Sequence, residues 1–185
     1  MTKTNVKRMT YADYAAIPPD DRRHEIIEGE WYMTPAPELA HQRVSRNLQV
    51  LLHLHVVEHR LGEVLDAPVD VVLSEHTVVQ PDLLFVSAER ASILTVKNVR
   101  GAPDLVVEIL SPSTAAIDRG EKRAVYEGAG VREYWIVDPA ASSFELHEFS
   151  SPRRTRVYTG DQSFESALLP GLTVRLADVF RRAGP

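Results

Sequence analysis

Apolar residues recur along the chain at two spacings, and these spacings predict both helices and strands. The longest helical pattern covers residues 38–60. Its apolar positions recur at the intervals that keep side chains on one face of a helix, and they are Val44, Leu48, Leu51, Leu52 and Val56. Runs rich in Val, Leu and Ile predict strands at 63–65, 69–73, 78–86, 104–110 and 133–137.

Capping and turn residues predict shorter elements around this centre. Thr10, with Asp13 three residues later, forms a capping box for a helix over 9–17. Glu28-Gly29 predicts the turn of a hairpin over 24–33. The other predicted elements are a helical turn at 87–94, a helix at 114–128, paired strands at 144–149 and 155–158, and a closing helix at 176–182, with Gly62 as the stop of the longest helix.

The order of these elements predicts an α/β fold. The run 104–110 is apolar enough to lie inside a sheet that is covered on both faces. The sequence shows no linker and no internal repeat. We therefore expect one α/β domain over residues 1–185, with a central mixed β-sheet flanked by helices and a β-rich C-terminal part.

Composition and charge narrow the class of protein. No apolar run approaches the roughly 20 residues that cross a bilayer, and the polar N-terminus has no signal-peptide core. We therefore expect a cytoplasmic protein without a membrane partner. The absence of cysteine excludes disulfides, thiolate metal sites and a cysteine nucleophile. The net charge of −5 argues against a protein that coats nucleic acid. It allows an acidic centre with a basic rim, for which the candidates are Arg22, Arg23, Arg119, Lys122, Arg123, Arg153, Arg154 and Arg156.

Two carboxylates, Asp82 and Glu108, stand inside predicted strands that are otherwise apolar. An ionised carboxylate in a buried strand is costly unless a partner or a metal compensates its charge. Mg²⁺ favours one or two carboxylates, with water and phosphate oxygens completing its shell. Because side chains alternate along a strand, Asp82 and Glu108 can meet on one side of the sheet if their strands are neighbours. The alternative is that each carboxylate pairs with an arginine or caps a loop.

A longer ordered set of motifs surrounds these carboxylates. The motifs are His24-Glu25-Ile26-Ile27-Glu28-Gly29, then Pro35, Pro37 and His41, then Gln80-Pro81-Asp82, the run from Gly101 to Thr114, Asp118, Lys122, Tyr126, the run from Gly130 to Trp135, and Val137-Asp138-Pro139. The set resembles the Uma-type family of bacterial endonucleases in the PD-(D/E)xK superfamily. The resemblance covers about residues 11–180. It implies that the single domain has a restriction-endonuclease-like fold and that it hydrolyses phosphodiester bonds with a metal ion.

The resemblance also implies roles for particular residues. Asp82 and Glu108 would bind Mg²⁺ or Mn²⁺, which activates a water and stabilises the transition state. Glu25 would add an outer carboxylate, and His41 would contact phosphate or the water shell of the metal. The alternatives are ordinary hairpin polarity for Glu25 and a helix-start role for His41. The implied partner is nucleic acid, with DNA favoured, and a homodimer is expected because two centres suit the cutting of two strands.

The general superfamily pattern has a lysine two residues after the glutamate, but position 110 of this chain is Leu. Lys122 is the best replacement if the predicted 114–128 helix packs back along the strand. Glu108 lies about 7 Å before the end of its strand, and Lys122 lies about 12 Å along its helix. A lysine side chain that leans toward the helix N-terminus recovers much of that difference.

The helix that carries Lys122 also carries Asp118 and Tyr126 at intervals of four residues. This spacing places all three side chains on one helical face. Asp118 would then orient Lys122, and Tyr126 would line the cleft. The alternative is an exposed salt bridge beside a packing tyrosine.

Two other functions compete with the nuclease. His55-Val56-Val57-Glu58-His59 matches the His-x-x-Glu-His pattern of one zinc protease class, although no third protein ligand is apparent in the sequence. The other alternative is a nuclease fold that persists as a binding or assembly module with an inactive centre. The acidic net charge and Leu110 favour this second alternative.

Overall fold

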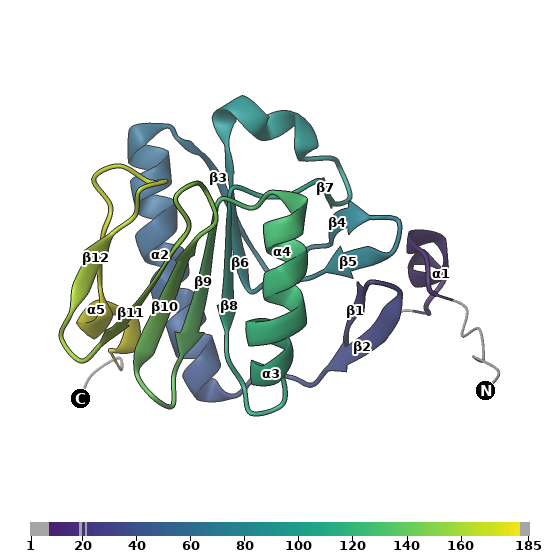
Figure 1. Ribbon diagram of the computed structural model, residues 1–185, viewed down its shortest axis with the longest axis horizontal. Helices are drawn as coiled ribbons and strands as arrows, with labels where there is room; N and C mark the ends of the chain where they lie inside the picture. The colour runs from purple at the N-terminus through teal and green to yellow at the C-terminus, as the bar shows by residue number, and fades with distance from the viewer. Residues whose placement is uncertain (1–7, 19, 21, 182–185) are drawn as a thin grey trace.

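Two β-sheets form the framework of the protein (Figure 1). The computed structural model describes residues 8–18, 20 and 22–181. The larger sheet has the strand order β11-β10-β9-β8-β6-β3. Its strands are β3 (Gly62–Asp66), β6 (Leu83–Ser87), β8 (Leu105–Ile109), β9 (Glu133–Asp138), β10 (Ser143–Glu148) and β11 (Arg154–Thr159). The sheet is mixed, because β8 runs parallel to β9 and antiparallel to β6.

The smaller sheet has the strand order β2-β1-β5-β4-β7. Its strands are β1 (Arg23–Ile27), β2 (Glu30–Thr34), β4 (Val71–Ser74), β5 (Thr77–Val79) and β7 (Val99–Arg100). The β1–β2 hairpin turns at Glu28 and Gly29, with φ angles of 51° and 88°. These left-handed values suit glycine, which has no Cβ to clash, and they confirm the predicted hairpin turn.

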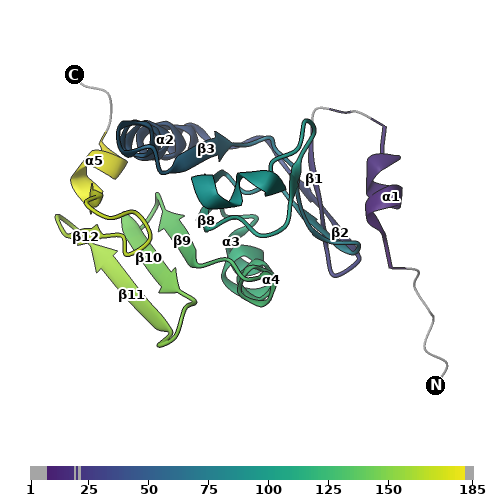
Figure 2. The same cartoon turned by 90° about the horizontal axis from the view of Figure 1, so that it is seen from above.

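Helices cover both faces of the larger sheet (Figure 2). On one face lies α2 (Leu39–His59). On the other lies a segment made of α3 (Ala115–Ile117), the π-helical turn η2 (Asp118–Lys122) and α4 (Arg123–Ala129). The remaining helices are α1 (Tyr11–Ala15), η1 (Ala88–Ile93) and α5 (Leu176–Phe180). None of the helices in the described residues has the length and apolar character to cross a bilayer.

Alternation along β8 divides the hydrophobic core into two clusters. Leu105, Val107 and Ile109 pack in the cluster that contains the buried residues of α2. Val106 packs in the other cluster, with Tyr126 of α4. Glu108 follows the same alternation, so its side chain lies on the face of the sheet that the α3–α4 segment covers.

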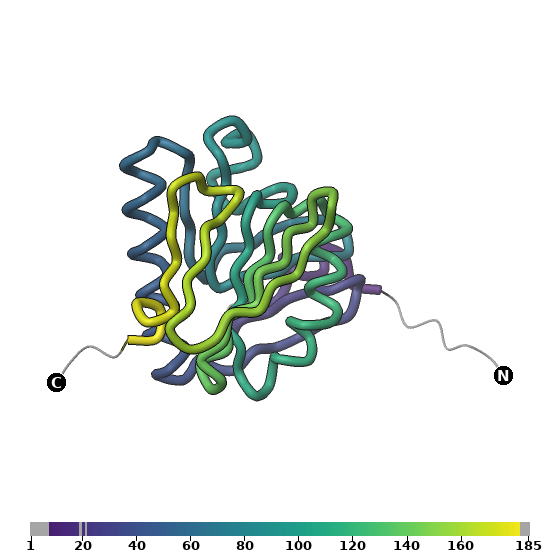
Figure 3. The backbone as a smooth tube through the Cα atoms, turned by 60° about the vertical axis from the view of Figure 1, so that its left-hand side comes forward, coloured from purple at the N-terminus to yellow at the C-terminus, as the bar shows by residue number. Residues whose placement is uncertain are grey.

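The C-terminal part is β-rich, as predicted, and it packs beside α2 (Figure 3). It contains β12 (Ser163–Glu165) and β13 (Thr173–Arg175), which pair with each other. Phe164, Val174, Leu176 and Val179 bury their side chains in the same cluster as the apolar face of α2. This packing anchors the short C-terminal elements against α2.

The prediction that residues 78–86 form a single strand is wrong. The structure divides it into β5 and β6, which belong to different sheets. Gln80-Pro81-Asp82 makes the crossing, and Pro81 has no N–H with which to continue a ladder. The carboxylate of Asp82 therefore stands at a junction between the two sheets.

Two helices differ from the prediction in their internal structure or their end. The 114–128 helix contains the π-helical turn η2 in its middle, and such turns insert an extra residue into the helical repeat. The closing helix, predicted over 176–182, ends at Phe180, and residue 182 lies outside the described residues. The α2 helix ends before Gly62 as predicted, with Arg60 in the left-handed conformation at φ 55°, and the capping box of Thr10 and Asp13 is confirmed.

Candidate active site

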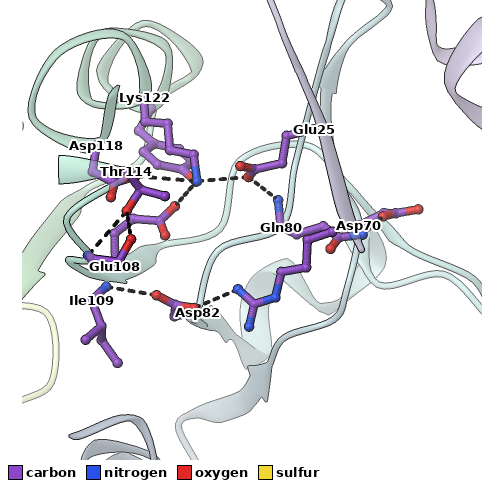
Figure 4. Close-up of polar contacts among 12 residues, drawn as sticks. Glu25, Asp70, Gln80, Asp82, Glu108, Ile109, Thr114, Asp118 and Lys122 are labelled. Atoms are coloured by element: carbon purple, nitrogen blue, oxygen red, sulfur yellow. Dashed lines mark hydrogen bonds and ion pairs between the residues drawn. The ribbon is translucent and has the colours of Figure 1, made fainter. Parts of the chain in front are cut away.

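Asp82 is buried, and hydrogen bonds from three separate elements hold its carboxylate (Figure 4). Its Oδ1 accepts a hydrogen bond of 2.8 Å from Nη1 of Arg23 on β1. Its Oδ2 accepts a 2.9 Å bond from the backbone N–H of Ile109 and lies 3.0 Å from Nε2 of His41 on α2. The side chain is thus tied to the strand that carries Glu108.

Asp82 and Glu108 share one side of the larger sheet. The β6–β8 register pairs Leu83 with Val107, and the next positions outward along the two antiparallel strands are Asp82 and Glu108. Both carboxylates line one pocket of about 180 Å³. The two residues therefore line the same pocket, and the hydrogen bond from the N–H of Ile109 ties Asp82 to the strand that carries Glu108.

Lys122 lies at the centre of three carboxylates. Its Nζ is 2.9 Å from Oε1 of Glu25, 3.1 Å from Oε1 of Glu108 and 3.6 Å from Oδ1 of Asp118. The hydroxyl of Tyr126 donates a 2.7 Å hydrogen bond to the same Oε1 of Glu108. The segment packs back along β8 as the geometric prediction required, and it brings the lysine to the glutamate although position 110 is leucine.

The π-helical turn positions the groups that surround Glu108. Asp118 and Lys122 begin and end this turn, and both side chains are buried. The hydroxyl of Tyr134 on β9 donates a 2.9 Å hydrogen bond to the backbone carbonyl of Asp118. Turns of this kind are frequent at functional sites because they redirect side chains within a helix. The alternative of an exposed salt bridge for this helix is wrong.

Burial and the nearest positive charges shift the pKa values of Asp82 and Glu108 in opposite directions. Burial alone would raise the pKa of Asp82, but hydrogen bonds and charge from His41 and Arg23 outweigh it and lower the pKa below its usual value. Burial raises the pKa of Glu108 well above its usual value. The charge of Lys122 opposes this rise, and the neighbouring carboxylates reinforce it. One carboxylate is therefore held ionised, and the other retains a proton more readily.

The pKa of Lys122 also lies well above its usual value. Burial would lower this pKa, but the charges of Glu108, Glu25 and Asp118 outweigh burial and raise it. One ammonium thus faces three carboxylates. Lys122 remains charged, and burial raises the pKa of Asp118 as it does that of Glu108.

The donor set fits a hard divalent cation. Four carboxylates, those of Glu25, Asp82, Glu108 and Asp118, face only two permanent cations, Arg23 and Lys122. The buried Oδ1 of Asp118 accepts no hydrogen bond from the described part of the chain. Within residues 8–18, 20 and 22–181, no three His, Asp or Glu side chains form a complete ligand cluster. This chemistry suits an ion such as Mg²⁺, which takes one or two carboxylates and keeps several waters.

Glu25 and His41, the two outer candidates, both reach the pocket. Glu25 accepts a 2.8 Å hydrogen bond from the backbone N–H of Gln80 and also contacts Lys122. His41 contacts Asp82, and its other ring nitrogen, Nδ1, is buried without a hydrogen bond among the described residues. From the sequence, Arg23 was predicted only as part of a basic rim. Its direct bond to Asp82 was missed, although the strand alternation Arg23, Glu25 could have indicated it.

Other basic residues of the proposed rim are engaged elsewhere. Arg119 pairs with Glu145 and Asp138, Arg153 pairs with Glu127, and Arg156 pairs with Glu148. None of these three arginines lines the pocket of Asp82 and Glu108.

The histidines of the protease-like pattern form no metal centre in the described residues. Nε2 of His55 lies 3.2 Å from the carbonyl of Pro170. Nδ1 of His59 lies 2.9 Å from the carbonyl of His55. These contacts engage ring nitrogens with backbone oxygens, which removes support from the zinc protease alternative.

Comparison with known proteins connects this arrangement to a family and a fold. The sequence model of the family Uma2, described as "putative restriction endonuclease", matches residues 11–177. The crystal structure of a "putative nuclease belonging to DUF820" from Anabaena variabilis superposes with a TM-score of 0.80. It is 18% identical, and the superposition covers 93% of this chain and 97% of that chain. This likeness confirms the predicted fold class. No curated protein matches the chain.

Proposed function

The chain belongs to the Uma2 family of restriction-endonuclease-like proteins, and from this we propose that it is a metal-dependent nuclease that hydrolyses phosphodiester bonds in DNA. The observation that carries the proposal is the hydrogen bond from the N–H of Ile109 to Asp82. It fixes one carboxylate beside the strand that presents Glu108, whose side chain Lys122 contacts. This joins two carboxylates and one ammonium in a single small pocket.

Asp82 and Glu108 would hold Mg²⁺ or Mn²⁺ in this proposal. The bound ion would supply a water of lowered pKa and polarise the phosphate. Asp82 is suited to the task because its lowered pKa keeps it ionised. Arg23 and His41 hold the Asp82 carboxylate in position, so it need not be ordered when the ion arrives.

Lys122 would act on the substrate through its charge. Its raised pKa keeps the ammonium protonated, so it is a hydrogen-bond donor and not a general base. It is suited to bind a non-bridging phosphate oxygen or to orient the attacking water, and either contact stabilises negative charge that grows in the transition state. Glu25 and Asp118 keep the ammonium within reach of Glu108 when no phosphate is present.

A binding or assembly module with an inactive centre is the second candidate function. The observation that favours it is that both carboxylates of the proposed metal site already have cationic partners, Arg23 for Asp82 and Lys122 for Glu108. In this alternative the ion pairs serve folding alone. The two candidates differ in whether Mn²⁺ binds and whether a strand is cut.

The test is cleavage of single-stranded and double-stranded DNA with Mg²⁺ or Mn²⁺. Wild type is compared with Asp82→Asn, which keeps the shape of the side chain, and with Asp161→Asn, a matched charge change at an exposed position outside the pocket. We expect at least about 100-fold slower cleavage for Asp82→Asn and unchanged cleavage for Asp161→Asn. Equal rates in all three proteins, or no cleavage by the folded wild type, would favour the inactive module.

We also propose that the protein acts as a homodimer. The support is chemical, since one pocket provides one centre and a double-strand cut needs two hydrolyses. Light scattering across a range of protein concentrations tests the assembly. A monomer at concentrations where duplex cleavage proceeds would contradict it.

A further inference from the structure

A second cleft of about 390 Å³ adjoins the candidate active site. We call it the base cleft. Its lining includes Tyr11, Tyr14, His24, Asp70, Gln80 and Asn98, together with the charged side chains of Asp20, Arg22 and Lys97. Gln80 lines both the base cleft and the active-site pocket. Figure 4 shows Glu25 and Asp70 on either side of Gln80.

Strand alternation separates the two hollows. Successive side chains of β1 point to opposite faces, and Arg23 and Glu25 line the active-site pocket whereas His24 lines the base cleft. The N–H of Gln80 donates to Glu25 on one side, and its side-chain Nε2 donates to Asp70 at 2.9 Å on the other. A single residue thus connects the two spaces.

The polar centre of the base cleft is rich in acceptors. Oδ1 of Asp70 accepts hydrogen bonds from the Tyr14 hydroxyl at 2.6 Å and from Nε2 of Gln80. This leaves Oε1 of Gln80, which is buried and accepts no hydrogen bond from any residue that the structure describes. A buried acceptor without a partner is costly. A ligand with N–H donors that reach Asp70 or Gln80 would complement these acceptors.

The charge of Asp70 disfavours a phosphate at this polar centre, because like charges repel at short range; Arg22 and Lys97 line the same cleft and could contact the backbone of a bound strand. A nucleobase fits better. Its ring and amino N–H groups match the acceptors of Asp70 and Gln80. Its flat ring matches a cleft walled by the aromatic side chains of Tyr11, Tyr14 and His24, since bases stack on such rings.

We propose that the base cleft binds one unpaired nucleobase of the strand whose phosphate occupies the active-site pocket. The inference rests on the proposed nuclease function and narrows its substrate to single-stranded or locally opened nucleic acid. The edge of a base that pairs in a duplex carries the N–H donors that Asp70 and Gln80 would accept. A fully paired base cannot offer that edge to the protein.

The test is equilibrium binding of a fluorescein-labelled 15-nucleotide single strand of DNA, in EDTA so that no cleavage occurs. One abasic nucleotide is moved along the strand, one position per oligonucleotide. We expect binding to weaken about tenfold at one position, because base stacking and hydrogen bonding are lost there, and to change little elsewhere. Duplex DNA of the same sequence should bind more weakly than the intact single strand.

Asp70→Asn provides the matched variant, because it keeps the shape and replaces an acceptor oxygen by a donor. We expect it to bind the intact strand about as weakly as wild type binds the sensitive abasic strand, and to lose the abasic penalty. Asp161→Asn controls for the change of charge. Thermal unfolding shows whether each variant is folded, and the abasic series on wild type decides the matter if Asp70→Asn is not.

Equal binding of all abasic strands by wild type, no binding of any strand, or an undiminished penalty in folded Asp70→Asn would overturn the base cleft. Cleavage of the same strands with Mn²⁺ is measured in parallel. Cleavage without base dependence contradicts only the base cleft. Base-dependent binding without cleavage supports the base cleft and contradicts the nuclease.

Discussion

The hydroxyl of Tyr126 donates to Oε1 of Glu108, the same oxygen that Lys122 contacts. Both hydrogen bonds go to one oxygen, and the other oxygen, Oε2, accepts none from the described residues. One half of the carboxylate is therefore held by the protein. The other oxygen, Oε2, is available to a ligand.

Replacing Tyr126 by Phe removes the 2.7 Å hydrogen bond and keeps the ring in the core. We expect a loss of about 1 kcal/mol in the free energy of unfolding and about tenfold weaker Mn²⁺ binding, because a group that orients a metal ligand is lost. Tyr134→Phe is the matched control, since it removes a hydrogen bond to the Asp118 carbonyl instead. Calorimetric titration should show the larger loss of affinity in Tyr126→Phe, and equal losses in both variants would contradict the assigned role.

Replacing Lys122 by Met leaves the three carboxylates of Glu25, Glu108 and Asp118 without their shared cation. We expect a loss of about 3 kcal/mol or more in the free energy of unfolding at neutral pH. Because protonation neutralises the stranded acids, the loss should shrink as the pH is lowered. Urea unfolding at several pH values measures both effects, and a loss that does not vary with pH would show that the carboxylates are not the cause.

The raised pKa of Glu108 predicts the sign of a pH effect on stability. The folded state binds this proton more tightly than the unfolded state, whose value is near the usual 4.5. In EDTA this residue's contribution is therefore fully present below about 4.5 and is lost as the pH rises through the folded pKa. Glu108→Gln should remove that decline. Melting temperatures of both proteins from acid to neutral pH provide the check, and parallel profiles would rule the explanation out.

Asp82 affects the pH dependence of stability with the opposite sign to Glu108. Its folded pKa is lowered, so its stabilising contribution is present above its usual value and is lost as the pH falls through the folded pKa. Asp82→Asn should therefore show a smaller loss of melting temperature than wild type on acidification below that usual value. The same melting series measures it, with Asp161→Asn as the charge-matched control. An equally steep fall of melting temperature on acidification in Asp82→Asn and in wild type would contradict this prediction.

Moving the lysine from position 122 to position 110 tests whether the element that carries it affects cleavage. Position 110 follows Glu108 at the interval that shares a strand face, and Leu110 is buried against the cluster that contains Tyr126. We expect Leu110→Lys combined with Lys122→Met to cleave DNA faster than Lys122→Met alone, because a long side chain from position 110 approaches Glu108. Leu110→Lys alone should destabilise the fold, since it buries a second ammonium. The comparison uses cleavage rates at matched folded fractions, and no recovery in the double variant would contradict the prediction.

The carboxylate pair was predictable because its signal is local. Asp82 and Glu108 interrupt apolar runs, and strand alternation alone indicates the face on which each lies. Lys122 was predictable because a helix that follows a buried strand must pack back over it. The α/β class followed from the same patterns, and the restriction-endonuclease-like fold followed from the resemblance of the motifs to a known family.

The other contacts depend on tertiary structure that no local pattern encodes. The bond from Arg23 to Asp82 forms because β1 of the smaller sheet reaches the junction at Gln80-Pro81-Asp82. The π-helical turn at Asp118 depends on a hydrogen bond from Tyr134, which lies on a different strand. The hydrophobic pattern of 78–86 is the same whether the chain continues in one sheet or crosses to another, so the crossing was missed.

Lys122 joins carboxylates from three separate parts of the chain, namely β1, β8 and the π-helical turn. Selection for stability therefore acts on this side chain whether or not the pocket cleaves DNA. A relative without nuclease activity would still be expected to retain the lysine, because its loss would destabilise the fold. Among relatives that have lost activity, we expect the residues near Oε2 of Glu108 and the residues that contact Gln80 to diverge first in sequence.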